Sequence, residues 1–413
     1  MVEVLFDGVR HASTEMERKE QSGQDARGPQ SRPQKVTFGV DRNGAARYVL
    51  VGERMMQGVR ILNSGKCYDG HTLFCHSYED PSTAASREGH IYLIDMEGHV
   101  QHEWRTQTAQ QSFCRLLPNG NLFYPTRDRS RLEAAGLREL DPDSNVVWYY
   151  HCRIDHDYQV LENGNLMLHT IIDRMVPALG VGLKRNPTML EITRDKELVW
   201  EWRGEEHLGE LEALLPVEGW AHFQERVRGQ FSFDWAHNNT CQIIPPNATA
   251  EREEAAGGPV RFKPGNIVFS YRSVDIIGVI ERETGQIVWA WGPGELDGQH
   301  KPHMLPNGNL LIFDNGTLRG YSRVIELNPL TEEVMWEYMA EPKESFCSRY
   351  ISGAQRLPNG NTLICEGASY HLFEVTPDRE VVWDYVSPFK EEGALAVYRC
   401  LRYAPEDVEG LMG

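Results

Sequence analysis

The 413-residue sequence predicts an all-β fold, a six-bladed β-propeller with four-stranded blades. Three observations predict it. A strand-like phrase ending in tryptophan occurs six times, a second phrase built on Asn-Gly-Asn is interleaved with it, and the two recur with a period of about 45 residues. Repeated units that each bury one face against the next form a single closed body.

Each repeat contains two turn signals. The Asn-Gly-Asn element is a hairpin turn, because Asn and Gly adopt positive φ at low cost, and the residues on both sides alternate as strands do. A second turn, of the D-x-x-G or P-D-x-x type, precedes the strand that carries the tryptophan. Two hairpins in each unit give four strands, which make one blade.

The tryptophans number the blades. Their separations are 44, 52, 89, 47 and 47 residues for Trp104, Trp148, Trp200, Trp289, Trp336 and Trp383. The long interval contains only one degraded turn phrase, at 263–270, and a helix-like stretch at 205–215. We therefore interpret it as a partly helical insertion at about 203–235 rather than a seventh blade. We expect the tryptophans to pack blade against blade.

The N-terminal region differs in composition from the repeats. Residues 11–35 are polar and charged, so we predict an N-terminal arm over 1–35 and a single propeller domain over 36–413. The sequence shows no secretory signal and no apolar run of the roughly 18 residues that a membrane span needs. Its eight cysteines include no CxxC pair. These features predict a reduced, cytoplasmic protein.

The charge balance limits the partners. Asp and Glu number 60 and Lys and Arg 42, which gives a formal net charge of −18. This balance argues against nucleic acid or an anionic membrane as the main partner. It remains compatible with a small anionic ligand in a locally basic pocket.

Histidines recur at one phase of the repeat. Propellers bind ligands at the mouth of the central channel, where the innermost strands of all blades converge. Counting back seven residues from the first Asn of each Asn-Gly-Asn turn leads to Ser112, His156, His300 and Ser352. His237, in FDWAHNN, precedes the corresponding strand of the blade with the degraded turn, so we expect it in the same ring.

A second alignment adds a cation and another imidazole. Arg323 in GYSRVIEL and His371 in ASYHLFEV occupy the same phase of neighbouring blades. We therefore expect His237, His300, Arg323 and His371 to converge. A guanidinium and imidazoles suit transfer of a sulfuryl or phosphoryl group, with one imidazole as nucleophile. With His156 added, the imidazoles could instead ligate a divalent metal, although the cation of Arg323 would repel it.

Four phrases together resemble a known family. FDWAHNN, GQH followed by LPNGNLLIFDNG, GYSRVIEL and SYHLFEV, over roughly residues 230–400, resemble the arylsulfate sulfotransferases, which are six-bladed propellers. The resemblance implies a sulfotransferase that needs no phosphoadenosine phosphosulfate and no other cofactor. An aryl sulfate would pass its sulfuryl group to a histidine, and a phenol would collect it.

The resemblance also implies roles for individual residues. His371 would be the sulfated nucleophile, while His237, His300 and Arg323 would hold the sulfuryl oxygens and one of the two histidines would move the phenolic proton. We expect His156, Tyr370, Tyr321 and Trp235 to contact the substrate. Ordinary blade packing is the competing explanation for the three aromatic residues. A homo-oligomer is compatible with this interpretation.

The chain departs from that family in two respects. Members of the family are typically exported and carry a disulfide near the active site, whereas this sequence shows no signal and no close cysteine pair before His371, where Cys347 and Cys365 are 18 residues apart. Two other functions therefore stay open. One is a metal-dependent lyase or hydrolase with a histidine cluster in the channel, and the other is a non-catalytic propeller scaffold.

Overall fold

The computed structural model describes residues 35–40, 46–51, 57–78, 88–108, 110–126, 134–229, 232–389 and 394–411. The chain divides into two units, residues 1–55 and 56–413. In the first unit, β1 (Lys35–Val40) and β2 (Ala46–Val51) form a two-stranded antiparallel sheet of their own. The repeated body, expected from Val36, therefore begins only at β3 (Gly58–Leu62). The rest of the expected arm, residues 1–34, lies outside the described residues.

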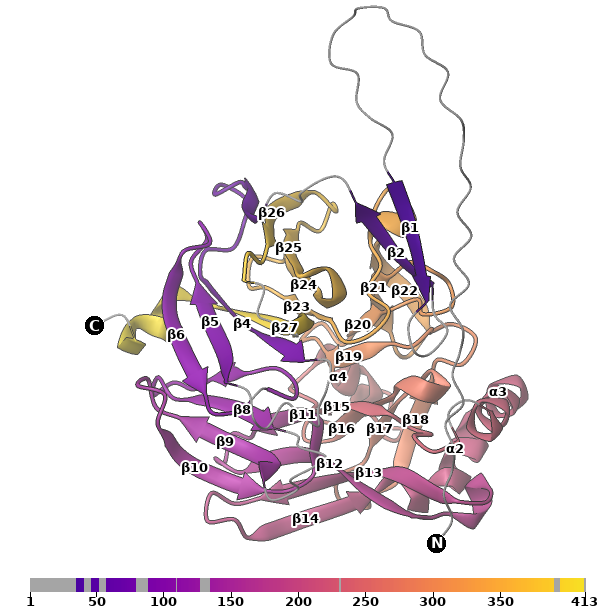
Figure 1. Cartoon of the computed structure of the whole chain (residues 1–413). Helices are drawn as coiled ribbons and strands as arrows, with labels where there is room; N and C mark the ends of the chain where they lie inside the picture. The colour runs from indigo at the N-terminus through magenta and orange to yellow at the C-terminus, as the bar shows by residue number, and fades with distance from the viewer. Residues whose placement is uncertain are drawn as a thin grey trace, which may run out of the picture. The chain divides into compact units, whose positions relative to one another are not determined.

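Six antiparallel sheets make up the second unit, so the predicted six-bladed propeller is confirmed (Figure 1). Blade 1 consists of β27 (Ala394–Tyr403), β4 (His71–Tyr78), β5 (Gly89–Ile94) and β6 (Val100–Thr106). Blade 2 consists of β7 (Arg115–Leu116), β8 (Leu122–Thr126), β9 (Gly136–Leu140) and β10 (Val146–His151). Blade 3 consists of β11 (Ile154–Val160), β12 (Leu166–Met175), β13 (Leu183–Ile192) and β14 (Leu198–Arg203).

The remaining three blades follow the same order. Blade 4 consists of β15 (Asn238–Ile243), β16 (Ile267–Tyr271), β17 (Ile276–Ile280) and β18 (Ile287–Trp291). Blade 5 consists of β19 (His300–Met304), β20 (Leu310–Asp314), β21 (Arg323–Asn328) and β22 (Glu333–Tyr338). Blade 6 consists of β23 (Gly353–Arg356), β24 (Thr362–Glu366), β25 (His371–Val375) and β26 (Val381–Val386).

Two strands from opposite ends of this unit close the ring. β27, the last strand in the sequence, pairs with β4 and becomes the innermost strand of blade 1. β3, the first strand of the unit, pairs with β26 and gives blade 6 a fifth, outer strand. Contacts between first strands of neighbouring blades, such as β11 with β15 and β23 with β27, place those strands around the channel.

A buried glutamate on the third strand of four blades joins each blade to the next. Its side chain accepts a hydrogen bond of 2.6–2.7 Å from the last Asn of its own Asn-Gly-Asn turn, and it pairs with an arginine of the following blade. We call these glutamates the interblade carboxylates. With their arginines they are Glu139–Arg194, Glu191–Arg282, Glu326–Arg356 and Glu374–Arg402.

The tryptophan of the outer strand makes a second contact to the next blade. The indole N–H donates to a backbone carbonyl in a turn of the following blade, for Trp148 to Arg194, Trp336 to Pro377 and Trp383 to Met96. In blade 3 the donor is Trp202, which bonds Gly285, rather than Trp200. The expected packing role is confirmed for the tryptophans that make this bond.

The long interval between blades 3 and 4 is the predicted insertion. It contains η3 (Gly204–Glu206), α2 (Leu208–Leu214) and α3 (Val217–Arg228). Leu211, Phe223 and Val227 anchor the two α-helices on the core of blades 3 and 4. The remaining helices are η2 (Pro177–Leu179), α4 (Ala248–Ala255), η4 (Arg272–Val274), η5 (Lys343–Ser345), η6 (Gly367–Ser369), α5 (Pro405–Val408) and η7 (Glu409–Leu411). In the described parts of the chain, none of the helices has the length and apolar character needed to cross a membrane.

The Glu374–Arg402 pair generates a stability prediction. Both side chains are fully buried, so Glu374→Gln leaves the Arg402 cation without its partner charge. We expect the free energy of unfolding to fall by about 3–5 kcal/mol, measured by urea denaturation. The matched control is Glu380→Gln on the same blade, because the Lys66–Glu380 pair is about half exposed and should contribute at most about 1 kcal/mol. Equal effects of the two substitutions would contradict this account.

Candidate functional site

The innermost strands are distorted where they enter the channel. Their pairing register shifts at residues 154–158 of β11, 238–241 of β15 and 300–303 of β19. Left-handed residues occur at or beside these points, with φ of +56° at His156, +44° at His237 and +51° at Lys301. Such bulges redirect side chains and are common next to active sites. Here they turn residues of neighbouring blades toward one another.

Three of the expected histidines meet at this mouth. The rings of His156 and His237 are perpendicular, with centroids 4.6 Å apart. His300 is buried and begins β19, which contacts β15, the strand that directly follows His237. Burial, reinforced by the cation of Arg272, holds the pKa of His300 well below its usual range. His300 is therefore a neutral imidazole near pH 7.

Each of the three imidazoles has Nδ1 beside a side-chain oxygen. The distances are 2.8 Å for His156 to Asp155, 2.8 Å for His237 to Asp234 and 2.7 Å for His300 to Asn315. An Nδ1–H that donates to oxygen leaves the lone pair on Nε2. Within the described part of the chain, Nε2 of His237 and Nε2 of His300 have no hydrogen-bonding partner.

Arg272, at the start of η4, supplies the cation of this group. The side chain is half-buried, its Nη2 donates to the carbonyl of Arg349 at 3.1 Å, and its Nε, which is itself inaccessible, has no partner among the described residues. Arg272 was not among the residues predicted from the sequence. Arg272 and Asn315 both stand six residues after the last Asn of a turn, at the ends of second strands, and aligning those ends would have found both.

Polar groups from the other blades complete the mouth. Asn315 donates to the carbonyls of Ser348 and Ile351, and the backbone N–H of Ser352 donates to the carbonyl of Tyr398. The ring of Tyr398 lies 6.3 Å from that of His156. From blade 2, Gln111 accepts from the His156 N–H and donates to Asp155. Ser112, expected at the same phase, is buried beside Gln111.

A charged cluster lies directly next to the imidazoles along the same innermost strands. Nζ of Lys301 is 2.7 Å from both carboxylate oxygens of Asp157, and Arg399 Nη1 is 3.6 Å from one of them. Both cations also lie over the ring of Phe113. Burial lowers the pKa of Lys301 to about 8. Two cations against one carboxylate leave the channel wall with a local excess of positive charge.

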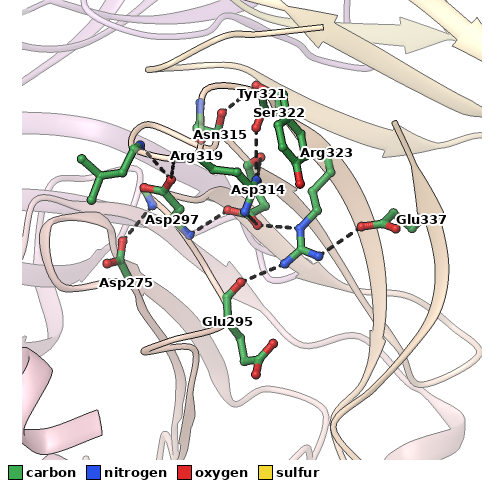
Figure 2. A network of polar contacts seen from close by, with 12 residues as sticks. Asp275, Glu295, Asp297, Asp314, Asn315, Arg319, Tyr321, Ser322, Arg323 and Glu337 are labelled. Atoms are coloured by element: carbon green, nitrogen blue, oxygen red, sulfur yellow. Dashed lines mark hydrogen bonds and ion pairs between the residues drawn. The ribbon is translucent and has the colours of Figure 1, made fainter. Parts of the chain in front are cut away.

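Arg323 lies outside this group (Figure 2). Figure 2 shows its guanidinium directed at Asp314, Glu337 and the carbonyl of Glu295, at 2.8, 3.1 and 2.8 Å. Tyr321 lies nearby, against the guanidinium of Arg319. Arg323 begins β21, a third strand, so two strands of its blade separate it from the channel. Among the described residues it has no contact with the three imidazoles.

His371 also begins a third strand, β25, and both of its ring nitrogens are engaged. Nδ1 lies 2.8 Å from Glu366, and Nε2 lies 3.3 Å from Asp384 and 2.9 Å from Nη2 of Arg60. Burial alone would lower the pKa of His371, but hydrogen bonds to Asp384 and Glu366 outweigh it and hold the pKa above its usual value. Its contacts in the described structure all lie within blade 6.

The two remaining aromatic candidates pack within the fold. Tyr370 has a left-handed backbone, with φ of +58°, and its ring lies 5.6 Å from that of His76. Trp235 is fully buried and donates to Asn186 at 3.0 Å. The structure thus brings together His156, His237 and His300, and it places Arg323, His371, Tyr370, Tyr321 and Trp235 in other surroundings.

The raised pKa of His371 predicts a pH-dependent stability. A group with a raised pKa in the folded state contributes stability below its unfolded value of about 6.5, and this contribution is lost as pH rises through the folded value. We expect the wild-type protein to exceed His371→Gln in free energy of unfolding by more at about pH 6 than at about pH 9. Urea denaturation at both pH values measures this difference. A difference independent of pH would contradict the charged arrangement.

Comparisons with known proteins complete the description. A sequence model for arylsulfotransferase (ASST) matches residues 139–388, and a second model with the same description matches residues 25–250. A comparison with curated protein sequences finds no match.

Several solved structures are similar in fold. A protein of unknown function from Bacteroides caccae has a TM-score of 0.50 and 13% identity, over 81% of this chain and 99% of that one. Virginiamycin B lyase from Staphylococcus aureus has a TM-score of 0.39 and 11% identity, over 81% and 90%. AztD from Citrobacter koseri has a TM-score of 0.40 and 7% identity, over 81% and 99%. At 13% identity, the first of these shows a shared fold alone.

Proposed function

Because the chain belongs to the arylsulfotransferase (ASST) family, we propose that it moves a sulfuryl group from an aryl sulfate to a phenol at the mouth of the channel. One observation carries this proposal most directly. Three imidazoles from blades 3, 4 and 5 lie at the mouth with the half-buried Arg272, whose backbone N–H donates to the carbonyl of His237. A site of this kind suits a group whose negative charge is spread over several oxygens.

Arg272 is the group best suited to bind the sulfuryl oxygens. A guanidinium presents several N–H donors in a planar fork and stays charged at any physiological pH. Arg272 is half-buried, and its Nε has no partner among the described residues, so a donor remains for a ligand. The excess positive charge of Lys301 and Arg399 would further favour an anion in this acidic protein.

His237 is the imidazole best suited to act as nucleophile. About 29% of its side chain is exposed, so a substrate can reach it, whereas His300 is almost completely buried. Asp234 holds Nδ1, which leaves the Nε2 lone pair for attack. The same carboxylate would stabilise the positive charge that develops on the ring when Nε2 forms a bond. This is the arrangement of a base oriented by a carboxylate.

The transfer would proceed in two balanced steps. Nε2 of His237 forms a bond to sulfur, the ester S–O bond breaks, and its electron pair leaves on the phenolate oxygen. His156, beside Asp155, would supply the proton that this oxygen takes up. In the second step a phenol gives its proton to His156 and attacks the sulfur, and the N–S bond breaks to restore His237.

The resemblance in sequence implies His371 as the nucleophile, and the contacts favour His237 instead. His371 is held between two carboxylates and Arg60, and its raised pKa favours the imidazolium, which has no lone pair for attack. If His237 is the nucleophile, substituting His237 should abolish the sulfated intermediate. If His371 is the nucleophile, substituting His371 should abolish it.

Intact mass spectrometry tests this function. We expect the protein incubated with 4-nitrophenyl sulfate to gain the mass of one sulfuryl group, and added phenol to remove it and to accelerate nitrophenol release. His237→Ala should abolish the gain, whereas the control His371→Gln should keep it. Loss of the gain in His371→Gln alone would transfer the nucleophile to His371. Absence of both the mass gain and phenol-dependent release in the wild-type protein would overturn the function.

A substitution of Arg272 tests the anion-binding role. We expect Arg272→Met to lower kcat/KM for 4-nitrophenyl sulfate by about 10²–10³-fold, because it removes a preorganised donor to the transferred group. Arg323→Met is the matched control, since Arg323 is a partly buried arginine whose guanidinium is engaged in ion pairs. Circular dichroism should show both variants folded. A greater loss in the control would place the anion site at Arg323.

A further inference from the structure

His169, on β12, is a buried imidazole that the proposed transfer does not use. Its Nδ1 lies 2.6 Å from the backbone carbonyl of Asp155, to which it donates its proton. Its Nε2 has no hydrogen-bonding partner among the described residues, although the side chain is fully buried. Burial lowers the pKa of His169, which keeps the ring neutral. A buried lone pair without a donor is costly unless something binds it.

Two further potential metal ligands lie close to His169. One ligand atom each of Asp155, His156 and His169 can be chosen so that all lie within 4.8 Å of one another, and all three residues are buried. We propose that these residues bind one divalent metal ion of the Zn²⁺ type. Two imidazoles and a carboxylate, with a fourth position open, are a ligand set that Zn²⁺ uses in catalytic sites. Ca²⁺ and Mg²⁺ prefer sites made of oxygen ligands.

The groups around these ligands support the assignment. Metal-binding histidines usually donate their second N–H to a carbonyl or carboxylate, which orients the ring, and His169 does so toward Asp155. Gln111 donates to Oδ1 of Asp155 at 3.0 Å and accepts from the backbone of His156 at 3.1 Å. A side chain from blade 2 thus holds two of the ligands in place.

A second carboxylate lies near the proposed ligands. The carboxylate of Asp234 is near enough to Asp155 for their charges to interact, so a divalent ion would meet two negative groups. Without metal, Nδ1 of His156 lies 2.8 Å from Asp155. Metal-binding side chains must be deprotonated, so binding should strengthen as pH rises.

This inference goes beyond the proposed function and does not depend on it. The ion would lie behind His156, whose ring is 4.6 Å from that of His237. A histidine that ligates a metal cannot also supply the proton that the proposed transfer draws from His156, so the metal-loaded protein should transfer the sulfuryl group more slowly than the metal-free protein. Metal binding and group transfer have separate readouts, so either can fail alone.

Titration with Co²⁺ tests the site. We expect the full chain, freed of metal with a chelator, to bind one Co²⁺ with visible d–d absorption, to lose the signal to Zn²⁺, and to bind less tightly at about pH 5.5 than at about pH 7.5. His169→Gln and Asp155→Asn should each weaken binding by about 100-fold or more, since a second-shell change alone costs about 10–100-fold. The control is His303→Gln, which replaces a half-buried imidazole whose Nδ1 lies 3.2 Å from the carbonyl of Lys301.

The proposal would be overturned by no stoichiometric Co²⁺ in the wild-type protein, by unchanged affinity in both ligand variants, or by equal loss in His303→Gln. Thermal unfolding should first show that the variants are folded. If a variant does not fold, the pH dependence of Co²⁺ binding by the wild-type protein replaces it as the test. Strong near-ultraviolet bands from cobalt–thiolate bonds would also overturn it, because none of the proposed ligands is a cysteine.

Discussion

The buried interblade carboxylate is the contact on which the ring depends. A glutamate inside a propeller needs compensation for the water it loses, and here it receives an amide from its own turn and a guanidinium from the next blade. The same contact explains why the second Asn of the turn phrase recurs so regularly. Blade 4 has the degraded turn and no such glutamate in β17. At the border between blades 4 and 5, α4 supplies the interblade contact instead, because the hydroxyl of Thr249 donates to the carbonyl of Gly308 in the turn of blade 5.

The acidic protein has a channel of opposite character. Its formal net charge is −18, yet Lys301 and Arg399 are buried and Arg272 is half-buried around the innermost strands. Burying charged groups is unfavourable for folding, and this kind of cost is often found at functional sites. The two networks on the third strands are different, because Arg323 and His371 are each surrounded by carboxylates. The charges of Arg323 and His371 are balanced by carboxylates of their own blades, and these contacts stiffen the face of the propeller that carries the channel mouth.

Much of the fold followed from the sequence because its signals are local. The Asn-Gly-Asn turns and the tryptophan spacing were sufficient for the blade count, and the helical stretch identified the insertion. The site was only partly predictable. Aligning first strands brought out His156, His237 and His300, whereas aligning third strands selected Arg323 and His371. Phase along a strand tells which face of the propeller a residue occupies, but not its distance from the axis. Arg272 and Asn315 end second strands, which were not aligned.

The position of β27 has a consequence for how the protein is made. This strand is the last of the propeller to leave the ribosome, yet it forms the inner wall of blade 1 and supplies Tyr398 and Arg399 to the channel. Blades 2 to 5 can fold as their own residues emerge, because each is continuous in sequence. Blade 1 must wait with β4 unpaired on one edge until synthesis passes residue 403. The nascent chain is therefore an open, inactive arc for most of its translation, and the histidines acquire their complete surroundings only in the final step.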